Sequence, residues 1–299
     1  MDSLALRRRL ETGWAGLLRP GLVALSAAAL FLGSACAGGE VPTATRIASF
    51  EVGERPRVAV ESQHGDIRVV GGLAGQIRVE AVLRDPDKVT YRVSQEGDAV
   101  RVEVRLAGIS FGDVVAFNVD RGADLTITVP AATSLELETL SGAIELRGLE
   151  ASAAARTANG EVKLIESRGE FSVRTANGGI EVAAFEGDLN LESDNGSVAI
   201  LDVSGVFNAV IGNGRLTFRG ELGVGSRNRL ETRNGRISFV LIDPANLSFD
   251  AKGENGDVDV DLGLTRRVDE RRHVVGSLGT GETELVLRAT NAAIEVIGR

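Results

Sequence analysis

Glycine recurs at a strict nine-residue spacing through the middle of this 299-residue chain. The positions are Gly160, Gly169, Gly178, Gly187, Gly196, Gly205, Gly214 and Gly223. Most of them begin the pattern Gly-x-Φ-x-Φ, in which Φ is apolar, as in Gly160, Val162 and Leu164. Each unit therefore predicts a short strand with one buried face, closed by a turn that contains glycine. So regular a spacing restricts the chain to folds that repeat one strand-and-turn unit.

Two kinds of corner alternate along this repeat. Every second glycine follows an asparagine, whereas the corners between them read SRGE, FEGD and VSGV, so the structural repeat has an eighteen-residue period. Farther along it lengthens to a twenty-one-residue period, and a last copy, Thr290–Val296, has Ala292 in place of the glycine. The predicted column of turns consists of Asn159, Gly160, Asn177, Gly178, Asn195, Gly196, Asn213, Gly214, Asn234, Gly235, Asn255 and Gly256.

Two all-β folds satisfy this pattern. In a parallel β-solenoid of the β-helix or β-roll kind, eighteen- to twenty-one-residue coils stack on one another, so like corners are neighbours. Their asparagines would lie about 4.8 Å apart, where the amides can hydrogen-bond and each residue can adopt the left-handed conformation of a tight corner. In an antiparallel β-meander, each Asn-Gly would instead be the tip of a hairpin. We predict the solenoid, because a long meander needs a cover that the sequence does not supply; the meander is the alternative.

The first 36 residues predict a lipoprotein-type signal peptide. A basic stretch precedes an apolar run, Gly21–Gly33, which is shorter than the roughly 20 residues that a membrane-spanning helix needs. The run ends in small residues followed by Cys36, the only cysteine of the chain. This arrangement resembles the lipobox of bacterial lipoproteins and implies that Cys36 is lipidated; an ordinary signal peptide is the alternative. Residues 37–48 read as a flexible tether.

The rest of the sequence divides into an irregular and a regular part. Residues 49–130 repeat the motif only sporadically and predict a β-rich cap with the first coils, which would protect open strand edges from aggregation. Residues 131–299 carry the regular strand repeats. A charged insertion, LTRRVDERRHVVGSLGTGE, interrupts these repeats near the C-terminus and is a candidate cap for the last coils.

Three features together carry a family resemblance. A lipoprotein-type leader precedes a TITVP strand, which is followed by LELETLSGAIEL and then by serial T-x-N-G-x-Φ-x-Φ units. This combination resembles the bacterial putative-adhesin family, a domain of unknown function built from β-strand repeats, over residues 49–298. The resemblance implies a β-solenoid exported to the cell envelope, and it supplies no catalytic residues to transfer.

Candidate binding residues are few. The Asn-Gly corners lead into strands rather than helices, so they are not phosphate-binding loops. The aspartate column of calcium-binding rolls is missing, and the alternating Asp257, Asp259 and Asp261 are expected on a solvated face, so we predict no metal site. An arginine-rich stretch is a candidate patch for an anionic glycan or lipid headgroup, with a solvated loop as the alternative. It contains Arg266, Arg267, Arg271 and Arg272.

The sequence assembles no catalytic set. The single cysteine belongs to the leader, and the two histidines, His64 and His273, are far apart in sequence. We therefore predict no enzymatic activity and no cofactor. A net charge of −9 argues against nucleic acid as a partner, because nucleic-acid binding needs a cationic face.

These observations predict a non-enzymatic lipoprotein of the bacterial cell envelope, lipid-anchored at the outer membrane or the periplasmic face in a Gram-negative cell. Its solenoid would act as a monomeric, adhesin-like binding or scaffolding module. The expected partners are a membrane, through the N-terminal lipid anchor, and an envelope glycan or protein. A sensory or regulatory protein acting through a membrane-protein partner is the alternative, and a polysaccharide-active β-helix enzyme is a third, less supported hypothesis.

Overall fold

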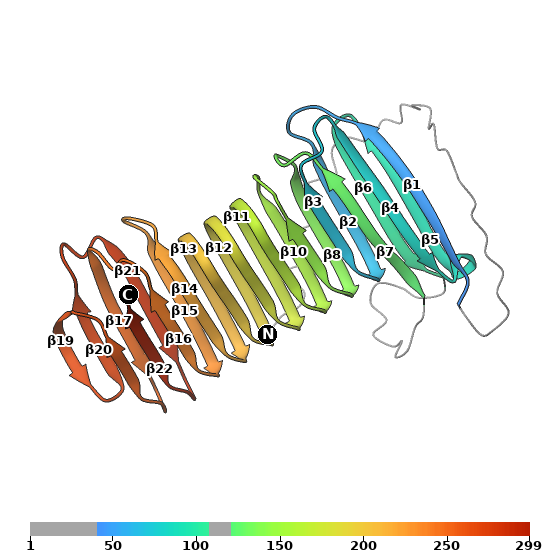
Figure 1. Ribbon diagram of the computed structural model, residues 1–299. Coiled ribbons are helices and arrows are strands. Elements are labelled where there is room, and N and C mark those ends of the chain that lie inside the picture. Colours follow the sequence, from blue (N-terminus) through green and yellow to red (C-terminus); the bar gives the residue numbers. More distant parts are fainter. Residues whose placement is uncertain (1–40, 108–120) are drawn as a thin grey trace, which may run out of the picture.

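Alternation of apolar and polar residues makes most of the chain β-strand. The computed structural model describes residues 41–107 and 121–299, and in it the strands stack along one axis into an elongated array (Figure 1). Ile180 and Val182 are 2% and 0% exposed and point inward, whereas Glu181 between them lies on the outer surface. This two-residue period gives every coil one apolar inner face, which the neighbouring coils help to bury.

The described residues form 22 strands and one short 3-10 helix, η1 (Pro86–Lys88). The N-terminal strands are β1 (Thr43–Glu51), β2 (Arg57–His64), β3 (Ile67–Gly71), β4 (Gln76–Arg84), β5 (Val89–Glu96), β6 (Ala99–Leu106), β7 (Gly122–Val129), β8 (Ser134–Ser141), β9 (Ile144–Arg147) and β10 (Ala153–Asn159). The central strands are β11 (Val162–Asn177), β12 (Ile180–Asn195), β13 (Val198–Asn213), β14 (Leu216–Leu222), β15 (Arg227–Asn234) and β16 (Ile237–Leu241). The C-terminal strands are β17 (Leu247–Gly253), β18 (Val258–Asp261), β19 (Thr265–Glu270), β20 (His273–Ser277), β21 (Thr283–Ala289) and β22 (Ile294–Gly298).

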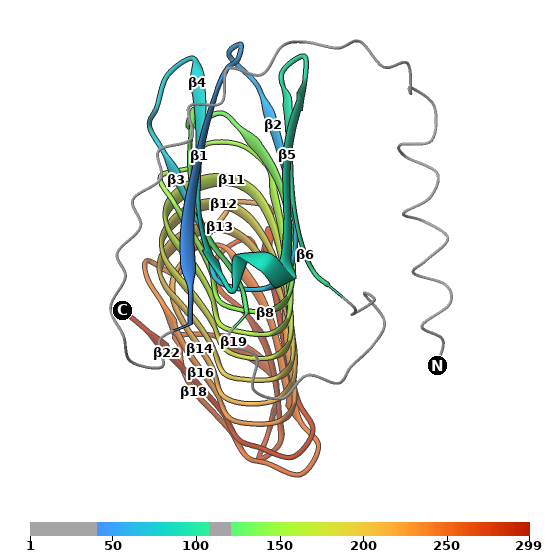
Figure 2. The same ribbon diagram turned by 90° about the vertical axis from the view of Figure 1, so that its right-hand side faces the viewer.

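The coils are flattened, so the array has two walls (Figure 2). The first wall runs in the order β5, β6, β2, β8, β10, the second parts of β11 to β13, β15, β21, β17, β20 and β19. The second wall runs in the order β1, β4, β7, β3, β9, the first parts of β11 to β13, β14, β16, β22 and β18. Each of β11, β12 and β13 contributes to both walls, because the strand bends round a corner without ending.

Pairing between the regular coils is parallel and in register. β11 pairs with β12, and β12 with β13, at a constant offset of one eighteen-residue repeat, so that Phe171 lies beside Leu189 and Leu189 beside Phe207. This confirms the predicted parallel solenoid and excludes the antiparallel meander for the regular repeats. Antiparallel pairs occur toward the two ends, between β1 and β4, β4 and β7, β5 and β6, β17 and β20, and β19 and β20.

Part of the expected tether is a strand. Residues 43–48, which we placed in a flexible segment, belong to β1 and pair antiparallel with β4 at the edge of the second wall. The prediction was wrong there because β1 is an edge strand. Its side chains alternate between exposed and half-buried, and only Phe50 is fully buried, so the segment lacks the apolar signal of a core strand.

The chain order and the spatial order of the last coils differ. β21 lies between β15 and β17 on the first wall, and β22 lies between β16 and β18 on the second. The C-terminal coil is thus inserted between two coils that precede it in sequence. The charged insertion forms the antiparallel hairpin β19–β20, which flanks β17 at the C-terminal end of the first wall.

Candidate functional site

The Asn-Gly corners form a continuous hydrogen-bonded edge. Each asparagine side chain after the first donates from Nδ2 to the Oδ1 atom of an asparagine in the adjacent coil, at distances from 2.7 to 3.1 Å. The first, Asn159, donates to the carbonyl oxygen of Leu140 at 3.3 Å. In spatial order the ladder contains Asn159, Asn177, Asn195, Asn213, Asn234, Asn291 and Asn255. Asn291, which precedes Ala292 rather than glycine, therefore belongs to the same ladder as the six asparagines of the Asn-Gly pairs.

A second column of hydroxyl groups lies inside this edge. Thr157, Thr175 and Ser193 stand two residues before an asparagine and are at most 5% exposed. Their hydroxyl groups donate to the carbonyl oxygen of the glycine one coil earlier, at 3.2, 3.1 and 3.2 Å. A buried hydroxyl without a partner is costly, so these bonds explain why threonine or serine repeats beside the Asn-Gly pairs.

At every corner of the Asn-Gly column except Gly214, whose φ is 151°, close approach rather than a positive φ requires glycine. A Cβ atom on Gly178 would lie 1.9 Å from the carbonyl oxygen of Gly160, and one on Gly196 would lie 1.8 Å from that of Gly178. The corner asparagines are not among the residues with positive φ, so the expectation that they adopt the left-handed conformation was wrong. That conformation occurs at the opposite corner, in Glu166, Ala184 and Asp202, where the strand bends between the walls.

The arginine-rich stretch is engaged within the protein. Arg271 pairs with Asp257 at 2.9 Å, and Arg272 donates to the carbonyl oxygen of Glu254 at 3.2 Å. The side chains of Arg266 and Arg267 lie outside the described residues, as does Cys36. Of the predicted patch, the structure therefore describes only the side chains of Arg271 and Arg272, and both contact the corner between β17 and β18.

The alternating aspartates lie on the surface, as their spacing predicts. Asp259 and Asp261 are exposed on β18, whereas Val258 and Val260 between them are buried. No cluster of three or more histidine, cysteine or acidic residues suited to a metal ion occurs among the described residues.

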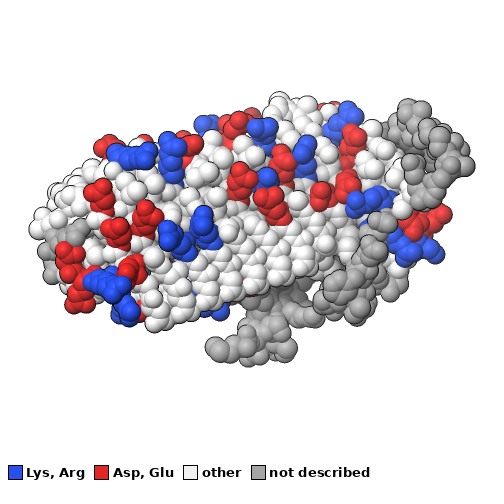
Figure 3. All heavy atoms as spheres, turned by 60° about the horizontal axis from the view of Figure 1, so that its bottom comes forward, with Lys and Arg blue, Asp and Glu red and all other residues white. Residues whose placement is uncertain are grey.

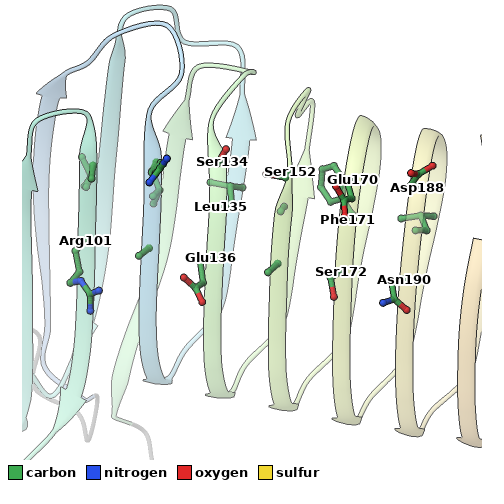
Figure 4. Close-up of a pocket in the computed structure, with 18 of the residues that line it drawn as sticks. Arg101, Ser134, Leu135, Glu136, Ser152, Glu170, Phe171, Ser172, Asp188 and Asn190 are labelled. Carbon is green, nitrogen blue, oxygen red and sulfur yellow. The ribbon is translucent and has the colours of Figure 1, made fainter. Parts of the chain in front are cut away.

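A groove that sequence analysis missed crosses the outer surface of the first wall. It has a volume of about 830 Å³ and extends from β5 and β6 across β2, β8 and β10 to β13. One row of outward positions crosses it in register: Arg101, Ala59, Glu136, Ala154, Ser172, Asn190 and Asn208. Figure 4 shows Glu136 on β8, Ser172 on β11 and Asn190 on β12, with Ser134, Glu170 and Asp188 two residues earlier on the same three strands.

Small side chains explain why this surface is hollowed. Ala59 and Ala154 lie on either side of Glu136 in the row, and Ser172 follows Ala154 on the next strand. A methyl or hydroxymethyl group fills little space above a sheet, so the floor of the groove is low here. In the sequence these small residues, Ala59, Ala154 and Ser172, are far apart or unremarkable, and they indicate a groove only once the register of the neighbouring strands is known.

The charges in and beside the groove are unevenly paired. Arg101 lies 3.0 Å from Glu61 at one end, whereas Glu170 and Asp188 are direct neighbours in register and neither makes an ion pair within the described part of the chain. One row below, burial raises the pKa of Glu138, Arg156 opposes this rise, and Glu61 and Glu136 add to it. The groove thus has an acidic character along β8, β11 and β12.

Charged side chains of both signs gather in rows over the coils, and an area without charges lies below these rows over the middle of the array in the view of Figure 3. No helix in the described ranges is long and apolar enough to cross a membrane.

Comparison of the sequence with family models gives a match over most of its length. The model for Toastrack DUF4097 matches residues 56–296. The chain belongs to the Toastrack DUF4097 family. This domain of unknown function has the strand-repeat character expected from the resemblance to putative adhesins, which is thereby confirmed.

Solved structures similar to this Toastrack chain have low sequence identity. A putative adhesin from Parabacteroides distasonis is 12% identical, with 87% of this chain and 98% of that one covered and a TM-score of 0.44. A putative adhesin from Bacteroides fragilis is 13% identical, with 87% and 100% covered and a TM-score of 0.38. A putative lipid binding protein from Parabacteroides distasonis is 10% identical, with 87% and 97% covered and a TM-score of 0.35. A comparison with curated proteins found no match.

Proposed function

We propose that this protein is a non-enzymatic binding module of the bacterial cell envelope, held to a membrane by a lipid on Cys36, which binds an envelope glycan along the groove of the first wall. The observation that carries the proposal is the groove itself, because it crosses consecutive coils of a hydrogen-bonded solenoid. Its volume of about 830 Å³ is in the range of ligand sites, and its floor is preformed by backbone pairing.

The membrane attachment is supported by the leader. Basic residues, a short apolar run and small residues precede Cys36, in the order that export and lipidation require. A single acyl chain gives only marginal membrane binding, so stable anchoring needs more than one chain on the modified cysteine. A lipidated N-terminus would hold the solenoid at the membrane and leave the outer surfaces of both walls free for a ligand.

A linear glycan fits the chemistry of the groove. Hydroxyl groups of Ser134 and Ser172 and amide groups of Asn190 and Asn208 can both donate and accept hydrogen bonds, as sugar hydroxyls do. The carboxylate groups of the groove are further acceptors for sugar hydroxyls. The groove runs across the strands, so the ligand would lie parallel to the solenoid axis and contact one coil after another.

Anchoring is tested by metabolic labelling with a fatty-acid probe in cells that express the full chain. We expect label on the wild-type protein and none on Cys36→Ala, with the signal sensitive to inhibition of lipoprotein signal peptidase. Label that persists on Cys36→Ala would exclude lipidation at this residue.

Glycan binding is tested by filling the groove. Ala154→Trp places a large side chain in the groove, and Ala199→Trp places the same side chain at a half-buried outward position of the second wall. On an array of bacterial envelope glycans, the full-length wild-type protein and Ala199→Trp should bind the same glycans, and Ala154→Trp should lose them. Equal binding by both variants, or no glycan bound by the wild-type protein, would overturn the groove as a glycan site.

A further inference from the structure

Six asparagines of the ladder stand directly before glycine, which is the dipeptide most prone to deamidation. The reaction begins when the backbone nitrogen of the following residue attacks the side-chain Cγ atom of asparagine. Glycine favours this attack because it lacks a side chain and leaves the backbone free to adopt the required geometry. The ladder therefore places six Asn-Gly pairs of the same chemistry along one edge. The pairs differ in the hydrogen bonds that hold the asparagine side chain and the glycine N–H group.

Two sets of hydrogen bonds lock the inner pairs. The backbone N–H groups of Gly160, Gly178, Gly196 and Gly214 donate to the carbonyl oxygen of the next asparagine in the ladder, at 3.1, 2.9, 2.9 and 3.0 Å. Each of the four asparagine side chains also donates through Nδ2 and accepts through Oδ1. For the glycine nitrogen to attack, the hydrogen bond of its N–H group would have to break, and the asparagine side-chain amide would have to rotate out of the ladder.

The pairs at the C-terminal end of the ladder are less constrained. Within the described residues, the N–H groups of Gly235 and Gly256 make no hydrogen bond. Asn234 still donates to Asn213 and accepts from Asn291, both at 2.7 Å. Asn255 is the last member, so it donates to Asn291 at 2.8 Å, and its Oδ1 atom accepts no hydrogen bond in the described part of the chain.

From this difference we infer that Asn255 is a site of spontaneous deamidation. The Gly256 nitrogen loses its proton and bonds to Cγ of Asn255, and the side-chain amide leaves as ammonia, which closes a five-membered succinimide. Water then opens this ring at either carbonyl carbon to give aspartate or isoaspartate. The sequence of steps needs only water and a base, and Asn255 is exposed to solvent.

Deamidation would have a defined effect on the coil formed by β17 and β18, in which Asn255 is the corner residue. Asn255 loses the Nδ2 donor that contacts Asn291, and a carboxylate then faces the Oδ1 acceptor of that residue. The new charge also lies between Glu254 and Asp257 in the sequence. Isoaspartate lengthens the backbone by one carbon at the corner, so the register of β18 against β22 is disturbed, while the ladder from Asn159 to Asn234 stays intact.

The experiment is incubation of the purified full-length protein at mildly alkaline pH, followed by peptide mapping with mass spectrometry that resolves isoaspartate. We expect Asn255 to react fastest, Asn234 next, and Asn159, Asn177, Asn195 and Asn213 slowest. Within the described ranges, the Asn177-Gly178 pair has two hydrogen bonds that the Asn255-Gly256 pair lacks, one from the Gly178 N–H group and one to the Oδ1 atom of Asn177. The loss of two ordinary hydrogen bonds corresponds to a rate difference on the order of tenfold or more. Equal rates in the folded protein, or an inner asparagine that reacts first, would overturn the inference.

Two controls separate folding from local sequence. In concentrated urea all six pairs should react at similar rates, and an unfolded chain in which Asn255 still leads by the same factor would mean that sequence alone sets the order. Asn291→Ala removes the acceptor of Asn255 and one partner of Asn234, so both should react severalfold faster while Asn177 is unchanged. An unchanged rate at Asn255 in this variant would contradict the role of the ladder.

Discussion

Asn291 accepts a hydrogen bond from Asn255 at 2.8 Å and donates one to Asn234 at 2.7 Å. The chain reaches Asn255 first, completes the β19–β20 hairpin, and only then returns to place Asn291 between two earlier asparagines. β21 correspondingly pairs in parallel with both β15 and β17. The last strands of the sequence are therefore interior strands of the solenoid, and the end of the array is made from residues 247–277.

Because the C-terminal coil is inserted in this way, we predict that residues 283–299 are essential for the folding of residues 247–277, which form the end of the array. Deletion of residues 283–299 removes β21 and β22 and leaves β15, β16, β17 and β18 without their partners on one side. We expect residues 247–277 to become sensitive to limited proteolysis, because their contacts with the solenoid run through the deleted coil. Deletion of residues 41–51, which removes the edge strand β1, serves as the control and should leave residues 247–277 protected. Protection in both deletions would contradict the insertion.

Adjacent glycines at one corner should differ sharply in their tolerance of alanine. A Cβ atom on Gly178 would lie 1.9 Å from the carbonyl oxygen of Gly160, whereas the nearest atom to one on Gly179 is the Ser197 carbonyl oxygen at 3.2 Å. We expect Gly178→Ala to lower the free energy of unfolding by more than about 2 kcal/mol and Gly179→Ala by less than about 1 kcal/mol. Urea denaturation followed by circular dichroism measures both values. Similar losses would mean that the coils can separate at this corner.

Inward and outward positions of one strand should respond differently to a charge. Val198 is 1% exposed, and its neighbour Ser197 is exposed at the corner. Val198→Asp buries a carboxylate without a partner and should cost more than about 3 kcal/mol, whereas Ser197→Asp should change stability by less than about 0.5 kcal/mol. The comparison uses the same denaturation assay, and equal effects would reverse the assignment of the two faces.

The Asp250 cluster predicts a pH dependence of stability. Asp250 contacts His273 at 3.1 Å and Arg288 at 2.6 Å. Burial acts to raise the pKa of Asp250, but the hydrogen bonds and charges of Arg288 and His273 outweigh burial and hold this pKa below its usual range. A lowered pKa in the folded state gives stability that is present above the unfolded pKa of about 3.9 and is lost as the pH falls through the folded pKa.

Asp250→Asn should therefore reduce the free energy of unfolding at pH 7 by about 1 kcal/mol, since solvent screens these partly exposed groups. The difference from the wild-type protein should shrink as the pH falls below about 4. Asp259→Asn is the control, because Asp259 is exposed and makes no ion pair in the described ranges, so its effect should be small at every pH. A difference for Asp250→Asn that persists unchanged at low pH would contradict an electrostatic origin.

The all-β solenoid and the positions of the repeated Asn-Gly corners could be predicted from the sequence. The backbone conformation of the corner residues and the close approach that requires glycine could not. The repeated T-x-N-G sequence indicated stacked corners, because a column of identical environments selects identical residues. Which corner carries the left-handed residues depends on how the strand bends between the walls, and Glu166, Ala184 and Asp202 share no residue type that would signal it.

The groove was missed for a related reason. Ala59 and Ala154 flank Glu136 on neighbouring strands, yet they are far apart in the sequence and belong to the irregular and the regular part respectively. An alanine at an outward strand position carries no signal by itself. Only the register between β2, β8 and β10 places these small side chains in one row.

The sequence by itself determined that this protein builds coils of two alternating strands with like corners in contact, because the two-residue period and the eighteen-residue period both concern neighbouring residues or neighbouring coils. Only the tertiary structure decided the order of the last coils and the shape of the first wall. The physical reason is that each coil presents nearly the same backbone hydrogen-bonding edge, so several neighbours can pair with it. Side-chain packing and chain connectivity then select Asn291, rather than Asn255, as the partner of Asn234.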